Sequence, residues 1–172
     1  MIEVVRGELA QTAARAVLRP VTADWNAPTP AMRRLELAIG TDVAEQCMRI
    51  GELPVGSAVV TPAGELPAEL LVNVVVRSAT ERVTPRGVAL GLRNGLRRAV
   101  EWSIETLALP PLGTGAGNLD PEEAAALMVP ILAAHLQESE FPARVEIRVE
   151  SEYEQAAFER EIAALSRNTG AA

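Results

Sequence analysis

Short apolar runs separated by turn-forming residues dominate the first half of the chain. Residues 2–5 (IEVV), 14–21 (ARAVLRPV) and 57–61 (SAVVT) have the length and composition of strands. Pro20 should lie at the end of the second strand, because proline has no N–H to donate to a sheet ladder. Residues 70–76 (LLVNVVV) form an unbroken, β-branched run that is typical of a strand buried on both faces.

Capping residues mark the helix starts. Thr29 and Thr84 each precede a proline, so a hydroxyl stands at the N-cap and a residue without an N–H at the first helical position. The same arrangement recurs as a near capping box at Asp120, Pro121 and Glu123. The pattern predicts helices over residues 30–39, 41–50, 85–102 and 121–138, then a strand over 145–149 and a final helix from 151.

The stretch TLALPPLGTGAGNLDPEE (residues 106–123) joins a short apolar strand to the strongest of these helix starts. Gly113, Gly115 and Gly117 alternate there with Thr114 and Ala116. Glycine takes positive φ without steric cost, so the loop can present several backbone N–H groups on one concave surface. With a helix N-terminus behind it, such a loop suits a phosphate or another anion, although a tight strand-to-helix connection uses glycine as well.

The order of the elements indicates the fold class. Strands alternate with helices after Gly51, and no repeat or linker divides the chain. This favours an α/β fold, a three-layer α/β/α sandwich with a mixed, largely parallel sheet. With 172 residues, 48% of them hydrophobic, one core can form. We expect a single domain over residues 1–168 and a frayed tail over residues 169–172.

Composition excludes several kinds of chemistry. All 16 basic residues are arginine, so the lysine that a Walker phosphate loop, a Schiff-base enzyme or a kinase needs is missing. The net charge of −7 argues against sequence-independent binding to DNA or RNA. One cysteine and one histidine do not make a zinc site, so we expect neither a metal nor a cofactor.

No targeting or catalytic motif stands out. Apolar runs stay well below the ~20 residues of a membrane span, and Met1 leads into a strand-like segment rather than a signal peptide. The sequence therefore predicts a cytoplasmic protein without a membrane partner. His135 has no serine or cysteine in a recognisable nucleophile motif to act with, so the catalytic residues, if there are any, stay unknown.

Four stretches together resemble the macrodomain family, the ADP-ribose-binding (Appr-1"-p processing) fold, over most of the chain. They are VRGEL near the start, LPVGSAVVTPAGELPAELLV in the middle, LALPPLGTGAGNLDPEEAA at the glycine loop and VEIRVESEYEQAAFEREI near the end. The resemblance implies a macrodomain-like α/β/α fold with a cleft at the carboxyl ends of the strands, where open α/β sheets bind ligands. The implied ligand is ADP-ribose or a related nucleotide.

The same resemblance implies which residues bind that ligand. Glu8, followed by Leu9, falls where the family usually has an aspartate that accepts a hydrogen bond from the adenine amino group. Asn118 replaces a glycine that is common in the family, but asparagine tolerates left-handed backbone better than most residues. The diphosphate would be held by the loop, whose residues are Gly113, Thr114, Gly115, Ala116, Gly117 and Asn118.

The chain departs from the family between Leu18 and Gly40. Family members usually have an Asn-Ala-Ala-Asn strand end and a run of glycines there, which form the second wall of the phosphate cleft. Here three prolines remove N–H donors and no glycine precedes Gly40, so we do not expect a symmetrical double cradle. Asn26 or Asp24 could substitute at the distal ribose, and Trp25 could cover a base or belong to the core or a dimer contact.

Three functions therefore stay open. The first is a binding module for ADP-ribose or a related nucleotide diphosphate. The second is a macrodomain-like scaffold without that ligand, which acts through homo-oligomerisation or protein contacts. The third is an ADP-ribosyl hydrolase or ADP-ribose-1"-phosphate phosphatase, which the missing asparagine and glycines disfavour. The scaffold's candidate surfaces are a glycine stripe and an arginine face on the helix from residue 85, namely Gly87, Gly91 and Gly95, and Arg93, Arg97 and Arg98.

Overall fold

A six-stranded sheet with the strand order β1-β6-β5-β2-β4-β3 forms the centre of the molecule. The computed structural model describes residues 1–115 and 118–169. All neighbouring strands are parallel except β3 and β4, so the sheet is mixed and largely parallel, as predicted. The strands are β1 (Ile2–Arg6), β2 (Ala16–Thr22), β3 (Ala58–Pro62), β4 (Leu70–Arg77), β5 (Thr106–Leu109) and β6 (Arg144–Val149).

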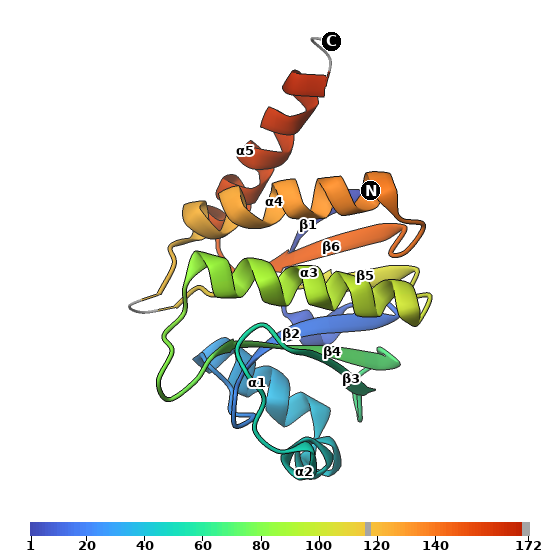
Figure 1. Cartoon of the computed structure of the whole chain (residues 1–172). Coiled ribbons are helices and arrows are strands. Elements are labelled where there is room, and N and C mark those ends of the chain that lie inside the picture. The colour runs from blue at the N-terminus through green and yellow to red at the C-terminus, as the bar shows by residue number, and fades with distance from the viewer. Residues whose placement is uncertain (116–117, 170–172) are drawn as a thin grey trace.

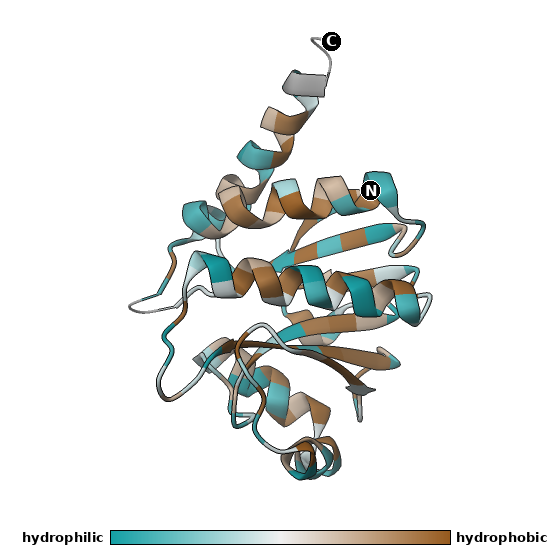
Figure 2. Ribbon diagram, viewed as in Figure 1, coloured by the Kyte–Doolittle hydropathy of each residue, from teal (hydrophilic) through white to brown (hydrophobic). Residues whose placement is uncertain are grey.

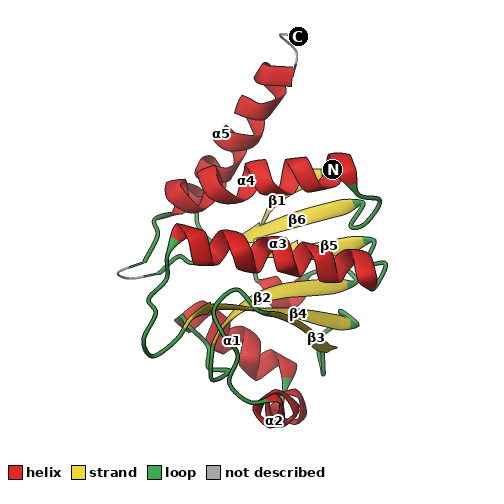
Figure 3. Ribbon diagram, viewed as in Figure 1, coloured by secondary structure: helices red, strands yellow, loops and turns green. Residues whose placement is uncertain are grey.

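Helices cover both faces of this sheet, which confirms the three-layer α/β/α arrangement (Figures 1 and 3). A short 3-10 turn, η1 (Leu9–Gln11), and the helices α1 (Pro30–Ile39) and α2 (Thr41–Ile50) lie on one face. The helices α3 (Pro85–Glu101), α4 (Pro121–Glu138) and α5 (Glu152–Thr169) lie on the other. None of the helices in the described part of the chain has the length and apolar character needed to cross a membrane.

Alternation along the inner strands builds two separate cores. In β2, Leu18 packs under α3 to α5, whereas Val17 and Val21 pack under α1 and α2. In β4, Val74 packs under α3 to α5 and Val75 packs under α1 and α2, because successive side chains of a strand point to opposite faces. This double burial explains why the strand at residues 70–77 is largely brown in Figure 2.

The glycine stripe of α3 brings that helix close to the sheet. A Cβ at Gly95 would lie 2.7 Å from Cδ1 of Leu18, and one at Gly91 would lie 3.5 Å from Cβ of Val74. The stripe therefore serves close packing, and it is not available to a partner protein.

One detail of the prediction was wrong. Pro20 lies inside β2, opposite Val74, rather than at the end of the strand. The pairing of β2 with β5 stops at Val17, and beyond that residue a strand can accommodate a missing N–H more easily. Helix α5 extends through Thr169, and the rest of the predicted tail, residues 170–172, lies outside the described residues.

Candidate functional site

The sheet opens between β2 and β5. In chain order, β3 and β4 are added on one side of β2, and β5 and β6 are added on its other side. The topological switch point therefore lies between β2 and β5. In the described residues they share two residue pairs, formed by Ala16 and Val17 of β2. After β5, Pro110 and Pro111 donate no N–H. The carboxyl ends of the strands therefore separate there, which is where open α/β sheets bind their ligands.

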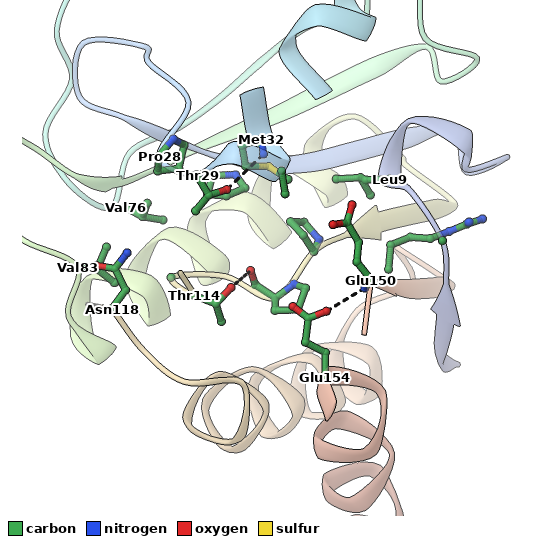
Figure 4. A pocket seen from close by; sticks show the side chains of 17 residues that line it. Leu9, Pro28, Thr29, Met32, Val76, Val83, Thr114, Asn118, Glu150 and Glu154 are labelled. Carbon is green, nitrogen blue, oxygen red and sulfur yellow. Dashed lines mark hydrogen bonds between the residues drawn. The ribbon is translucent and has the colours of Figure 1, made fainter. Parts of the chain in front are cut away.

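A cleft occupies this opening, and Figure 4 shows its lining. Its cavity volume is about 70 Å³, well below the roughly 300–1,000 Å³ of typical ligand pockets. The cleft is therefore narrow in this conformation. It is lined by Gly7 and Leu9 after β1, Pro20 and Val76 in the strands, Pro28, Thr29, Ala31 and Met32 at the start of α1, Val83, Pro110, Pro111, Gly113, Thr114 and Asn118 before α4, and Arg148, Glu150 and Glu154 around the end of β6.

Gly113 has a backbone conformation that requires glycine. Its φ is 75°, and a Cβ there would lie 2.7 Å from Cγ2 of Val88. The loop is closed by two internal hydrogen bonds, from Leu119 N to Gly113 O (3.0 Å) and from Asn118 N to Gly115 O (3.1 Å). The turn is thus fixed by its own backbone before any ligand arrives.

Two amides of this loop have no hydrogen-bond acceptor among the described residues. The N–H groups of Gly113 and Thr114 donate to no acceptor within the described residues, and both residues line the cleft. Asn118 also lines the cleft, but its backbone N–H is already used, so its side chain is the part left for a ligand. Ala116 and Gly117, which the sequence also suggested as donors, lie outside the described residues.

The start of α4 contributes less to an anion site than we expected. The predicted near capping box is a complete one, in which Asp120 Oδ1 accepts from Glu123 N and Glu123 Oε2 accepts from Asp120 N, each at 2.9 Å. Glu122 adds a further carboxylate to the first turn. Three acidic side chains compete with an anionic ligand for the positive end of this helix dipole.

The start of α1 forms the wall of the cleft opposite the glycine loop. The sequence did not predict a role for it in the site. Thr29 caps the helix by accepting from Met32 N at 3.2 Å, and no acidic residue stands in the first turn. Ala31, the second residue of α1, lines the cleft, and an N–H at that position has no intrahelical acceptor. The Thr-Pro capping signal had already located this helix start. The three prolines between Leu18 and Gly40 had indicated only a loss of backbone N–H donors.

Glu8 and Leu9 lie at the end of the cleft formed by β1 and β6. Leu9 lines the cleft, whereas Glu8 is exposed and lines a shallow hollow next to it, together with Glu150. Glu150 forms an ion pair with Arg34 (2.7 Å between Oε2 and a guanidinium nitrogen). Glu154 accepts from the N–H of Glu150 at 2.8 Å, as Figure 4 shows. These acidic residues of the cleft lie in the VEIRVESEYE stretch, which matched the family without indicating individual roles.

Asn26 lies outside the narrow cleft, in a polar hollow of about 680 Å³ that adjoins it at Asn118 and also contains Asp24 and Arg77. Hydrogen bonds, first from Thr22 and then from Asn26, hold the pKa of the Asp24 carboxyl below its usual value. The bond from Thr22 Oγ1 to Asp24 Oδ1 measures 2.6 Å. The hollow thus holds an ionised carboxylate at neutral pH beside amide and guanidinium groups.

Trp25 belongs to the core and covers no part of the cleft. It is 5% exposed, and its Nε1–H donates to the carbonyl of Gly51 at 2.8 Å. Its backbone φ is 67°, in the left-handed region. Of the interpretations open for this tryptophan, the core residue is confirmed.

Comparison with known proteins agrees with this geometry. The Macro domain family model matches residues 32–128. An uncharacterized protein of Aeropyrum pernix is 31% identical over 126 residues, which cover 73% of this chain and 67% of that protein. An O-acetyl-ADP-ribose deacetylase of Klebsiella pneumoniae is 31% identical over 105 residues, which cover 58% of this chain and 60% of that enzyme.

A solved structure shows the same fold. The macrodomain of Oceanobacillus iheyensis, determined with ADP, superposes with a TM-score of 0.88 at 18% identity and covers 97% of this chain and 92% of that one. The family model matches more than half of the chain, from within α1 through β3, β4, α3, β5 and the glycine loop into α4. The chain therefore belongs to the Macro domain family, as the four sequence stretches implied.

Proposed function

We propose that the protein is a binding module for ADP-ribose or a related nucleotide diphosphate. The observation that carries this proposal is the pair of unpartnered N–H groups at Gly113 and Thr114, at the switch point of the sheet. Main-chain amides on a hydrogen-bonded glycine turn can bind a diphosphate without the lysine that this chain lacks. The start of α1 adds the positive end of a helix dipole on the other side.

The cleft also suggests where the rest of the ligand would lie. Leu9 and the exposed Glu8 are proposed to contact the adenine, with the Glu8 carboxylate accepting from the amino group. Asn118 connects the cleft to the polar hollow, and Asn26 is proposed to contact the distal ribose there. Ala116, Gly115 and Gly117 complete the proposed set of loop donors for the diphosphate.

Binding requires the cleft to widen. A nucleotide diphosphate does not fit into about 70 Å³, so the α1 start and the glycine loop must separate when it enters. The required movement involves a loop and a helix end, which move more easily than strands of the sheet.

A thermal-shift comparison tests the proposal. ADP-ribose at about a hundred times its dissociation constant should add ~2.7 kcal/mol to the stability of the folded state. AMP should give a smaller shift and ribose 5-phosphate a smaller one still, since each contains only part of the ligand. An unchanged melting temperature at near-millimolar ADP-ribose would count against binding.

Hydrolysis of an ADP-ribose ester is a second candidate. The name of the Klebsiella relative, O-acetyl-ADP-ribose deacetylase, supports it, as does the Asp24 carboxylate in the polar hollow. Positioned groups provide most of such catalysis, and this chain lacks the family's asparagine-rich strand end and glycine run. Release of acetate from O-acetyl-ADP-ribose, and its loss in D24N, would establish this activity.

A further inference from the structure

A groove runs between α3 and α4 on the face of the molecule turned to the viewer in Figure 1. Its volume is about 600 Å³, far larger than the nucleotide cleft. The groove is formed by the C-terminal halves of both helices, whereas the nucleotide cleft lies near their N-terminal ends. It is lined by Arg93, Leu96, Arg97 and Val100 of α3 and by Pro130, Ile131, Ala134, His135 and Glu138 of α4, with Ser139 after it.

Three charged side chains of the groove have no partner among the described residues. Arg93 and Arg97 are exposed on α3, and Glu138 is exposed near the end of α4. None of these three has an ion pair or a hydrogen bond to another residue in the parts of the chain that the structure describes. By contrast, Arg98 bonds Glu101 and the carbonyl of Ala58, so it does not belong to this surface.

Apolar and small residues form the rest of the groove. Leu96 is buried at its base, Ile131 is partly exposed, and Pro130, Ala134 and Val100 are exposed. Helix α4 is thus apolar on its outer side as well as on the side that faces the sheet. An amphipathic surface helix normally presents polar residues outward, so this face has the composition of a contact surface.

We propose that this groove is the interface of a symmetric homodimer, in which α4 of each copy lies in the α3/α4 groove of the other. A two-fold interface must be self-complementary, because the same patch meets itself. The groove meets this condition, since one wall presents Arg93 and Arg97 and the other wall presents Glu138. With the two α4 helices antiparallel across the two-fold axis, each Glu138 reaches the arginine wall of the other copy.

The spacing of the charges suits such a contact. Arg93 and Arg97 are one helical turn apart, about 6 Å along α3, so one carboxylate can lie between their guanidinium groups. The small side chains Ala134 and Pro130 allow the two α4 backbones to approach closely. The contact replaces water at an apolar surface and pairs four arginines with two carboxylates per dimer.

The available area predicts a reversible dimer. Helices α3 and α4 contain 17 and 18 residues, so each extends about 25 Å, and two helices side by side offer a projected face of about 500 Å². Specific interfaces bury roughly 600–1,000 Å² per partner. The α3/α4 face lies below that range, so dimerisation should be weak and should depend on protein concentration.

Sedimentation velocity over micromolar to near-millimolar protein tests the proposal. The unmodified chain should shift from monomer to dimer across this range. R93E/R97E should self-associate at least roughly tenfold more weakly, and so should E138R, because each places like charges together. R86E, which reverses one arginine charge on α3 outside the groove, should dimerise like the unmodified chain. Circular dichroism confirms that each variant is folded.

A mixing experiment separates this interface from any other. In a one-to-one mixture of R93E/R97E with E138R, a heterodimer pairs opposite charges at both symmetry-related contacts, so dimerisation should return. A chain that stays monomeric at near-millimolar concentration would overturn the proposal. A dimer that all variants form equally well would also overturn it. Because the groove does not overlap the nucleotide cleft, ADP-ribose binding by the monomeric variants should match that of the unmodified chain.

Discussion

The methyl group of Thr29 lies against Gly115 across the cleft. A Cβ at Gly115 would be 3.1 Å from Cγ2 of Thr29, and the φ of Gly115, 126°, is a conformation that favours glycine. The start of α1 and the glycine loop therefore touch, and this contact keeps the cavity small. Thr29 has two separable roles, since its hydroxyl caps α1 and its methyl group narrows the cleft.

Removal of that methyl group should improve access to the cleft. T29S keeps the capping hydroxyl, so we expect ADP-ribose to bind several-fold more tightly with little change in stability. T29A loses the cap as well, which should cost about 1 kcal/mol. T84A is the matched control, because Thr84 caps α3 in the same way without lining the cleft. Weaker binding by T29S would mean that the methyl group contacts the ligand rather than obstructing it.

Alanine substitutions at two glycines of the α3 stripe should have opposite effects on the stability of the protein. G91A places its Cβ at an ordinary contact distance from Val74, so the gain in helix propensity, about 0.5–1 kcal/mol, should dominate. G95A forces its Cβ to within 2.7 Å of Leu18 and should lower the free energy of unfolding by about 1–3 kcal/mol. Urea denaturation measures both changes. Equal effects would contradict the packing described for α3.

Local signals account for the elements that the sequence predicted. The Thr-Pro pairs, the Asp120 capping box and the β-branched run at residues 70–76 each act within a few residues, and the structure has a helix or a strand at each of them. The turn at Gly113 follows from the same kind of local information. Strand order did not follow from any local signal, and it was the family resemblance that implied the fold and the cleft.

Features that depend on distant contacts were not predictable in this way. The inward position of Trp25 depends on the carbonyl of Gly51, 26 residues away. The narrowness of the cleft depends on Thr29 and Gly115, which no spacing rule connects. The opening at Pro20 depends on where the pairing of β2 with β5 ends. In each case the deciding partner lies on another element, so the pattern of one segment contains no information about it.

A buried arginine provides a third test. The guanidinium of Arg19 is buried between the sheet and the α1/α2 layer, and its Nε donates to Asn73 Oδ1 at 2.6 Å. Burial lowers the pKa of Arg19, yet an arginine keeps its charge. N73L should cost about 2–3 kcal/mol, because it removes the oxygen acceptor of a buried cation and the amide donor to Val59 O and Thr61 Oγ1. R19M/N73L should recover much of that loss. Additive losses in the double mutant would contradict this coupling.

The single thiol should be protected in the folded protein. Cys47 is 1% exposed, so iodoacetamide should label it only as fast as the protein opens. Burial also raises the pKa of this thiol. Its contribution to stability is therefore complete below the pKa of the unfolded thiol, about 8.5, and is lost as the pH rises through the higher folded value. C47A should lose less stability than the unmodified chain between neutral pH and pH ~10.

Isothermal titration of ADP-ribose tests the central claim most directly. We predict heat that saturates at one ligand per chain. G115A should abolish it, because a Cβ there strains the loop and presses on Thr29. G51A is the matched control, since Gly51 also has positive φ but has open space around it, and it should bind as the unmodified chain does. No heat at near-millimolar ADP-ribose, or equal heat from G115A and the unmodified protein, would contradict a nucleotide site at the Gly113 loop.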